Sequence, residues 1–146
     1  MTRLVERYFE DYVLDETGGG GSRTLDQSDV NTFAGLTMDF HPAHVNRAFA
    51  EERFGGRLVH GVLTFGLVVG LTVEYNPLAV AYGYERVRFP RPVRAGDTVT
   101  ATSLVVDLAE HRRPGIGLVT KQYTGVNQDG ETVLSCRHVL AVDRRP

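Results

Sequence analysis

The sequence has little of several features that define other classes of protein. Its single cysteine, Cys136, excludes an intrachain disulfide and a cysteine-based metal site. Charge of one sign is not in excess, because 16 Lys and Arg residues stand against 18 Asp and Glu residues, for a net charge of −2. We therefore expect neither a nucleic acid nor a membrane surface as a partner.

Long hydrophobic runs are also missing. No segment approaches the roughly 18 consecutive apolar residues of a membrane-spanning helix. Residues Met1–Glu10 carry charges and lack the apolar core of a signal peptide, so we expect a cytoplasmic protein. A chain of 146 residues with 42% hydrophobic and 23% charged residues is typical of a globular protein, and we expect residues 1–146 to form a single domain.

The first half of the chain is predicted to be mainly helical. Gly18–Gly21 is interpreted as a solvated, flexible loop. Asp26 is typical of the N-cap of a helix that ends near Gly35, and a second short helix is expected from about Asn46 to Arg53. Residues 59–75 are the most apolar stretch. They predict a long buried helix, because a helix that is apolar on nearly all sides must be covered on all sides.

The second half changes to the alternating pattern of strands. Strands are expected from Ala81 onward, then over residues 98–108, 118–126 and 133–142. Asp129-Gly130 is a hairpin-turn signal between the last two strands. Helices followed by a run of antiparallel strands predict an α+β fold, in which one helix packs on a strongly curved sheet.

Three residues with the chemistry of an acid–base site lie before and at the start of the apolar helix. Asp39 and His44 flank a turn that Pro42 starts, so their side chains can converge. A carboxylate and an imidazole are sufficient to activate a water molecule and to deliver a proton. Gly61 is expected where the helix begins. There its N–H has no partner within the helix and can bind a carbonyl oxygen as part of an oxyanion hole.

The same residues also fit structural roles. Asp39 could be a helix cap, His44 a core or surface histidine, and Gly61 a packing glycine. Asp39, His41 and His44 are the ligand types of a zinc or non-haem iron site. Pro42 lies between the two histidines and is expected to turn His41 away, so we predict that no metal binds here.

The first predicted strand and the segment that follows it are rich in arginine. A solvated strand face and a set of anchors for substrate phosphates are both consistent with this pattern. This arginine series comprises Arg86, Arg88, Arg91 and Arg94, and Arg112 and Arg113 are further possible anchors for phosphates.

The segment Phe33–His44, with the sequence FAGLTMDFHPAH, resembles the signature of the MaoC-like (R)-specific enoyl-CoA hydratases. In that family an Asp is followed by a variable residue, Asn, Pro, an apolar residue and His. The similarity continues at Val59–Gly61 and at residues 89–97, FPRPVRAGD, and it spans roughly Phe9 to Val142. The resemblance implies a hot-dog fold, a long helix wrapped by a curved antiparallel sheet. It also implies a homodimer whose two sheets join edge to edge.

Two positions depart from the family pattern. Met38 stands where a glycine often precedes the Asp, and His41 replaces the usual Asn. We interpret the Asn as a residue that shapes the loop, because Asn tolerates unusual backbone angles, and His is a polar residue that also visits them.

The activity implied by the resemblance is the reversible addition of water to a trans-2-enoyl-CoA thioester, which gives a 3-hydroxyacyl-CoA. Asp39 would hold and deprotonate the water, and His44 would orient it and assist proton delivery to the α-carbon. The N–H of Gly61 would stabilise the enolate. Burial beside the apolar helix is expected to raise the pKa of Asp39 and to strengthen it as a base. No metal or organic cofactor is expected, because coenzyme A is part of the substrate.

The substrate is an acyl-CoA, or in a variant of this hypothesis an acyl-carrier-protein thioester. The pattern leaves the acyl chain and the direction of the reaction open. The residues expected to bind it are His41, His60, Phe65 and Arg88. A thioesterase is disfavoured, because it often uses an acid on the central helix and Gly61–Val73 has none. A non-catalytic hot-dog subunit that binds acyl thioesters is the other alternative.

Overall fold

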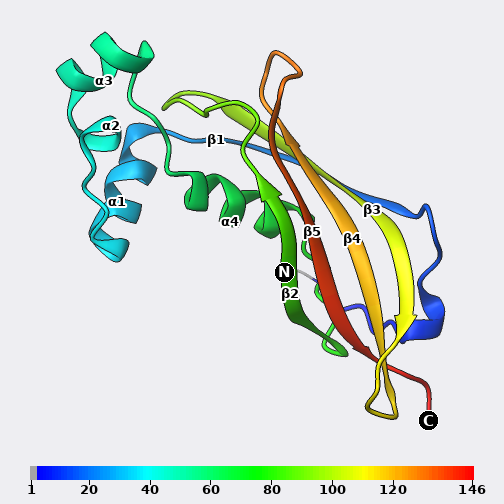
Figure 1. Cartoon of the computed structure of the whole chain (residues 1–146). Helices are drawn as coiled ribbons and strands as arrows, with labels where there is room; N and C mark the ends of the chain where they lie inside the picture. Colours follow the sequence, from blue (N-terminus) through cyan, green and yellow to red (C-terminus); the bar gives the residue numbers. More distant parts are fainter. Residues whose placement is uncertain (1–2) are drawn as a thin grey trace.

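The computed structural model describes residues 3–146 and contains one curved, five-stranded antiparallel sheet (Figure 1). The strands are β1 (Thr17–Thr24), β2 (Ala79–Arg88), β3 (Thr98–Glu110), β4 (Ile116–Val126) and β5 (Thr132–Asp143), in the order β1-β3-β4-β5-β2. The helices are the 3-10 helix η1 (Phe9–Asp11), α1 (Gln27–Thr37), α2 (Pro42–Val45), α3 (Arg47–Phe54) and α4 (Gly61–Thr72). The predicted α+β class is confirmed.

The glycine run is an edge strand, so its interpretation as a flexible loop is wrong. Strand β1 pairs with β3, with an irregularity in register between Gly19 and Gly21. Gly19 has a φ of +85°, and a Cβ there would lie 2.8 Å from the carbonyl oxygen of Ala101 on β3. Glycine is therefore required by the close approach of two backbones, a contact between segments far apart in the sequence.

The helix boundaries in the first half follow local capping signals. Asp26 and Asp29 form a capping box at the start of α1. Pro42 is the first residue of α2, and Asn46 caps α3, which ends at a left-handed Gly55. The predicted N-cap at Asp26, the turn at Pro42 and the short helix near residues 46–53 are confirmed, except that α1 continues beyond Gly35 to Thr37.

Helix α4 is buried on one face only, so the prediction of burial on all sides is wrong for the single chain. Thr64, Val68 and Thr72 are buried. On another face Val62 is 64% exposed, and a Cβ on Gly66 or Gly70 would meet nothing within 4 Å among residues 3–146. The sheet of one chain covers only one side of α4. The helix also carries apolar residues on its other sides, and these stay at least partly exposed in the single chain.

Helices α1, α2 and α3 gather beside the N-terminal end of α4 and project beyond the β2 edge of the sheet (Figure 1). The backbone N–H of Leu58, just before α4, donates to the carbonyl oxygen of Ala43 in α2, with an N···O distance of 2.9 Å. This contact brings the residues around α2 to the start of α4. No helix within residues 3–146 combines the length and hydropathy needed to cross a bilayer.

Candidate active site

Asp39 lies directly after a sharp turn of the backbone at the end of α1. Met38 adopts the left-handed conformation, with a φ of +65°, and its N–H donates to the carbonyl oxygen of Ala34 over 2.8 Å. A glycine takes this conformation without cost, which explains why Gly is common at this position in the related signature. Here Met38 occupies it, and the chain turns directly into Asp39.

His41 caps helix α2, and its backbone is ordinary, with a φ of −55°. Its Nδ1 accepts a hydrogen bond from the N–H of Ala43 at 3.1 Å. The unusual backbone angle therefore lies at Met38, and the interpretation that His41 is chosen for such an angle is wrong. An Asn side chain provides the same kind of cap, so His41 replaces Asn as a capping residue.

His44 presents one ring nitrogen to Asp39. Its Nδ1 lies 2.8 Å from the carbonyl oxygen of Leu58. A carbonyl can only accept, so we assign the proton of the neutral ring to Nδ1 and a lone pair to Nε2. Nε2 lies 4.0 Å from Oδ2 of Asp39. This separation is too long for a direct hydrogen bond and fits a water molecule that contacts both atoms.

His60 is buried against the ring of His44 and supports the position of the other site residues. It is 2% exposed, and its ring stacks on that of His44 with centroids 3.8 Å apart. Its Nε2 donates to the backbone carbonyl oxygen of Asp39 at 3.0 Å, and Phe33 packs nearby with ring centroids 4.8 Å apart. The ring therefore fixes both His44 and the Asp39 loop. Sequence reasoning placed His60 near the site but did not find this arrangement.

The two carboxylate oxygens of Asp39 have different surroundings. Oδ1 accepts a hydrogen bond from the N–H of His41 at 3.2 Å, while Oδ2 faces His44 and His60 at 4.0 Å each. The side chain is 53% exposed in the single chain. The burial on which the expectation of a strengthened base rested is therefore absent, because Asp39 lies within an exposed segment, residues 35–42.

Gly61 is the first residue of α4, as predicted, and it borders a cavity of about 350 Å3 that His44 also lines. The N–H groups of a first helical turn have no partners within the helix. A Cβ on Gly61 would lie 3.2 Å from the ring of Phe89, which lines the same cavity. The glycine thus leaves the N-terminal end of α4 open beside His44.

The other predicted substrate-binding residues lie further along α4 and β2. The ring of Phe65 meets that of Tyr84 edge to face, with centroids 4.8 Å apart. Arg88 is exposed, and its Nη1 donates to the carbonyl oxygen of Val87. Arg91, from the same arginine series, is the member that lines the cavity beside Gly61.

The possible metal ligands brought together are Asp39, His44 and His60, whose ligand atoms lie within 4.8 Å of one another. His41 is not among them. The two histidine rings are stacked at an interplanar angle of 25°, and Nε2 of His60 carries the proton that it donates to the backbone carbonyl oxygen of Asp39, so only His44 directs a nitrogen lone pair toward Asp39. Tetrahedral coordination requires converging lone pairs, and this donor set does not provide them.

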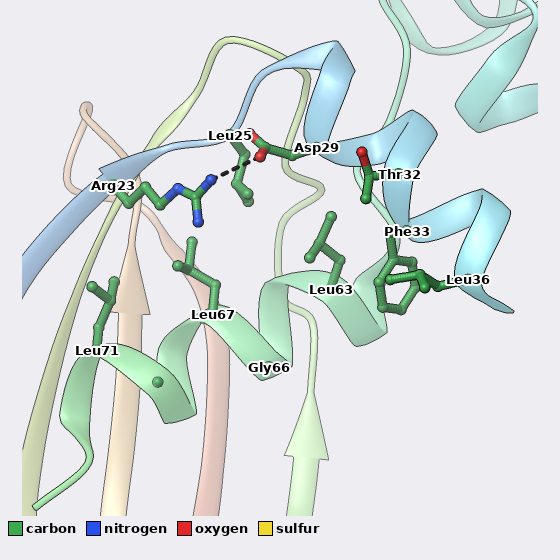
Figure 2. Close-up of a pocket in the computed structure, with 11 residues that line it drawn as sticks. Arg23, Leu25, Asp29, Thr32, Phe33, Leu36, Leu63, Gly66, Leu67 and Leu71 are labelled. Carbon is green, nitrogen blue, oxygen red and sulfur yellow. Dashed lines mark hydrogen bonds and ion pairs between the residues drawn. The ribbon is translucent and has the colours of Figure 1, made fainter.

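An apolar groove of about 520 Å3 runs between α1 and α4 (Figure 2). Its polar lining includes an ion pair between Arg23 and Asp29, with an N···O distance of 2.7 Å. The groove meets the Asp39 site through Phe33 but contains no histidine. Its apolar lining includes Phe33, Leu36, Leu63 and Leu67.

A smaller cavity, of about 200 Å3, lies between α4 and the sheet near β2. His138 lines it and is 6% exposed. Its Nδ1 lies 2.9 Å from the hydroxyl oxygen of Tyr123, and Tyr84 stacks on its ring with centroids 4.2 Å apart. Burial, assisted by the nearby charge of Lys121, lowers the pKa of His138 from 6.5 to about 4.

The depressed pKa of His138 predicts a loss of stability in acid. The unfolded chain takes up a proton at His138 below pH 6.5, whereas the folded chain does so only near pH 4. The contribution of His138 to the free energy of unfolding is therefore fully present above pH 6.5, and it is lost as the pH falls from 6.5 to about 4. We expect the difference in Tm between about pH 7 and about pH 5 to be smaller in His138→Phe than in the wild type. Equal differences in the two proteins would contradict this assignment.

The sequence of this chain matches a known family model and is similar to two proteins named as hydratases. The family model described as "MaoC like domain" matches residues 15–127. An (R)-specific enoyl-CoA hydratase of Rhodospirillum rubrum is 38% identical over 113 residues, which cover 75% of this chain and 77% of that protein. A mesaconyl-CoA hydratase of Cereibacter sphaeroides is 35% identical over 143 residues, which cover 95% of this chain but 42% of that protein.

The fold has a close counterpart among solved structures. The structure described as a monoamine oxidase regulatory protein of Archaeoglobus fulgidus superimposes with a TM-score of 0.90 at 33% identity. The superposition covers 97% of each chain.

Proposed function

The chain belongs to the MaoC-like domain family, and from that premise we propose that it is a hydro-lyase. It adds water reversibly across the double bond of a trans-2-enoyl-CoA thioester and forms an (R)-3-hydroxyacyl-CoA. The hydratase names of two relatives support this reaction class. Coenzyme A enters as part of the substrate, and the proposal needs no other cofactor.

The observation that carries the proposal is the 4.0 Å separation between Nε2 of His44 and Oδ2 of Asp39. A water between these atoms donates one hydrogen bond to each. As its oxygen attacks the β-carbon, Asp39 and His44 together take up one proton. The pair then returns a proton to the α-carbon, so the site regains its starting state after each turnover.

The helix start supports stabilisation of the negative charge that forms during attack. The N–H of Gly61 is available at the positive end of the α4 dipole and beside His44. The thioester oxygen gains charge as the enolate forms, and a preorganised N–H donor stabilises it. We propose that His60 is a positioning residue rather than a contact for substrate, because its ring is buried against His44.

The test is a spectrophotometric assay with crotonyl-CoA, which follows loss of the enoyl thioester absorbance, together with chiral analysis of the product. Hydration to the (R)-3-hydroxy thioester is the expected result. Binding of a panel of enoyl-CoA thioesters without turnover of any of them would instead establish a non-catalytic binding subunit. Release of free coenzyme A would identify a thioesterase. That alternative is disfavoured because α4 carries no acid and the first acid after it, Glu74, is paired with Arg7 and Lys121.

We also propose that two copies associate through the free edge of β2. Among residues 3–146 this strand pairs only with β5, and Val80 and Tyr82 on it are 64% and 59% exposed. An unpaired apolar edge is stabilised by a second copy that continues the sheet.

The dimer proposal predicts that charge on the β2 edge separates the copies. Val80→Lys with Tyr82→Lys is expected to halve the mass measured by light scattering. Val13→Lys, at a 63% exposed residue outside the sheet, is the matched control and should leave the mass unchanged. A wild type with the mass of one chain would contradict the proposal.

A further inference from the structure

The small cavity between α4 and β2 has more polar groups than a chamber for a hydrocarbon chain requires. Apolar side chains from α4 and β5 form part of its wall, and charged or hydrogen-bonding groups form the rest. Ligand sites typically combine an apolar lining with a few convergent polar groups. The lining includes Val69, Tyr84, Lys121, Tyr123, His138 and Leu140.

Lys121, the only lysine of the chain, is the most unusual of these groups. It is 4% exposed, and its Nζ lies 3.0 Å from Oε1 of Glu74, its one ion-pair partner within residues 3–146. An ammonium group carries three donors, so this contact leaves donors for a further acceptor. Glu74 also binds Arg7, which in turn pairs with Glu16, and these four charges sum to zero.

His138 supplies a second polar group at the same wall. Nδ1 is engaged with the hydroxyl of Tyr123, and Nε2 is buried with no hydrogen-bonding partner in the part of the chain that the structure describes. A buried polar atom without a partner costs free energy that a ligand oxygen can recover. Lys121 and His138 are register partners on adjacent strands β4 and β5, so both side chains lie on the same face of the sheet.

The cavity lies in line with the start of α4. Gly61, Phe65 and Val69 are four residues apart in turn and form one row along the helix, which places Val69 about 12 Å from Gly61 along the axis. The Phe65–Tyr84 ring pair stands between the two ends. An acyl group whose thioester binds at Gly61 therefore reaches the cavity only with the distal end of a chain of medium length.

We propose that this cavity binds an oxygen atom at the distal end of the acyl chain, with Lys121 and His138 as the residues that recognise it. The inference rests on the proposed hydratase activity and adds a substrate class to it: enoyl thioesters with a terminal hydroxyl, keto or carboxylate group. A neutral oxygen is favoured over a carboxylate, because Glu74 already balances the charge of Lys121.

The test compares kcat/KM for octenoyl-CoA, its ω-hydroxy analogue and its ω-carboxy analogue, with crotonyl-CoA as a substrate too short to reach the cavity. The wild type is expected to prefer the ω-hydroxy over the methyl terminus by about 10-fold or more. A preference for the carboxylate also supports an oxygen site. A preference for the methyl terminus, or no preference, overturns the inference even when crotonyl-CoA is hydrated. No hydration of any substrate overturns the proposed function itself.

Lys121→Met is expected to bring octenoyl-CoA and its ω-hydroxy analogue toward equal kcat/KM while leaving crotonyl-CoA turnover unchanged. Glu74 keeps its contact with Arg7 in this variant, which favours folding. His138→Phe gives an independent measurement of the same ratio, and Arg112→Met, in an exposed loop, is the matched control. Retention of the wild-type preference in both cavity variants would show that these residues do not recognise the oxygen.

Discussion

Asp39→Asn is expected to lower kcat for crotonyl-CoA hydration by roughly 100- to 10,000-fold, the range for loss of a positioned acid–base group. The amide keeps the shape of the side chain and can still accept the N–H of His41 through Oδ1. It loses the negative charge at Oδ2, which lies 4.0 Å from Nε2 of His44. Water between the two residues is then no longer deprotonated. Steady-state kinetics with equal enzyme concentrations measure the effect.

His41→Asn provides the control for this prediction. Asn can cap α2 as His41 does, and the chemical pair of Asp39 and His44 is untouched. We expect its kcat to stay close to that of the wild type. His44→Ala should resemble Asp39→Asn, because the water loses one of its two ligands. Near-normal turnover in Asp39→Asn, with intact folding, would rule out the proposed role of the carboxylate.

Gly125→Ala is expected to destabilise the fold by about 1–3 kcal/mol, with a fall in Tm of roughly 3–10 °C. Gly125 is buried in β4, and a Cβ there would lie 2.7 Å from Cγ2 of Val68, a fully buried residue of α4. A methyl group fits there only if the stiff, β-branched side chain of Val68 or the strand itself shifts. The loss is a pure packing effect, because no polar group changes.

Gly35→Ala is the matched control for Gly125→Ala. Gly35 lies within α1, and a Cβ there would meet nothing within 4 Å among residues 3–146. The substitution removes the entropic cost of glycine in a helix and is expected to raise Tm slightly. Thermal unfolding followed by circular dichroism compares the two variants. Equal changes in Tm would contradict a specific contact between α4 and β4.

The sequence by itself determined the features that depend on neighbouring residues. The cap at Asp26, the turn started by Pro42, the short helix near residues 46–53 and the alternating pattern of the later strands all depend on a few neighbouring residues, and each appears in the structure. Asp39 and His44 could be paired from the sequence for the same reason, since one turn separates them. The resemblance to a known family suggested the activity that we propose, which spacing alone left open.

Tertiary structure decided what depends on distant segments. The glycine run became a strand because β3 offers a backbone partner about 80 residues later. His60 reached the back of His44 because the chain returns past α2 before α4 begins. The exposure of one face of α4 follows from how much a single sheet can cover, and no local pattern encodes that. Local sequence preferences determine which helices and strands form, and long-range packing determines which of their faces and side chains contact one another.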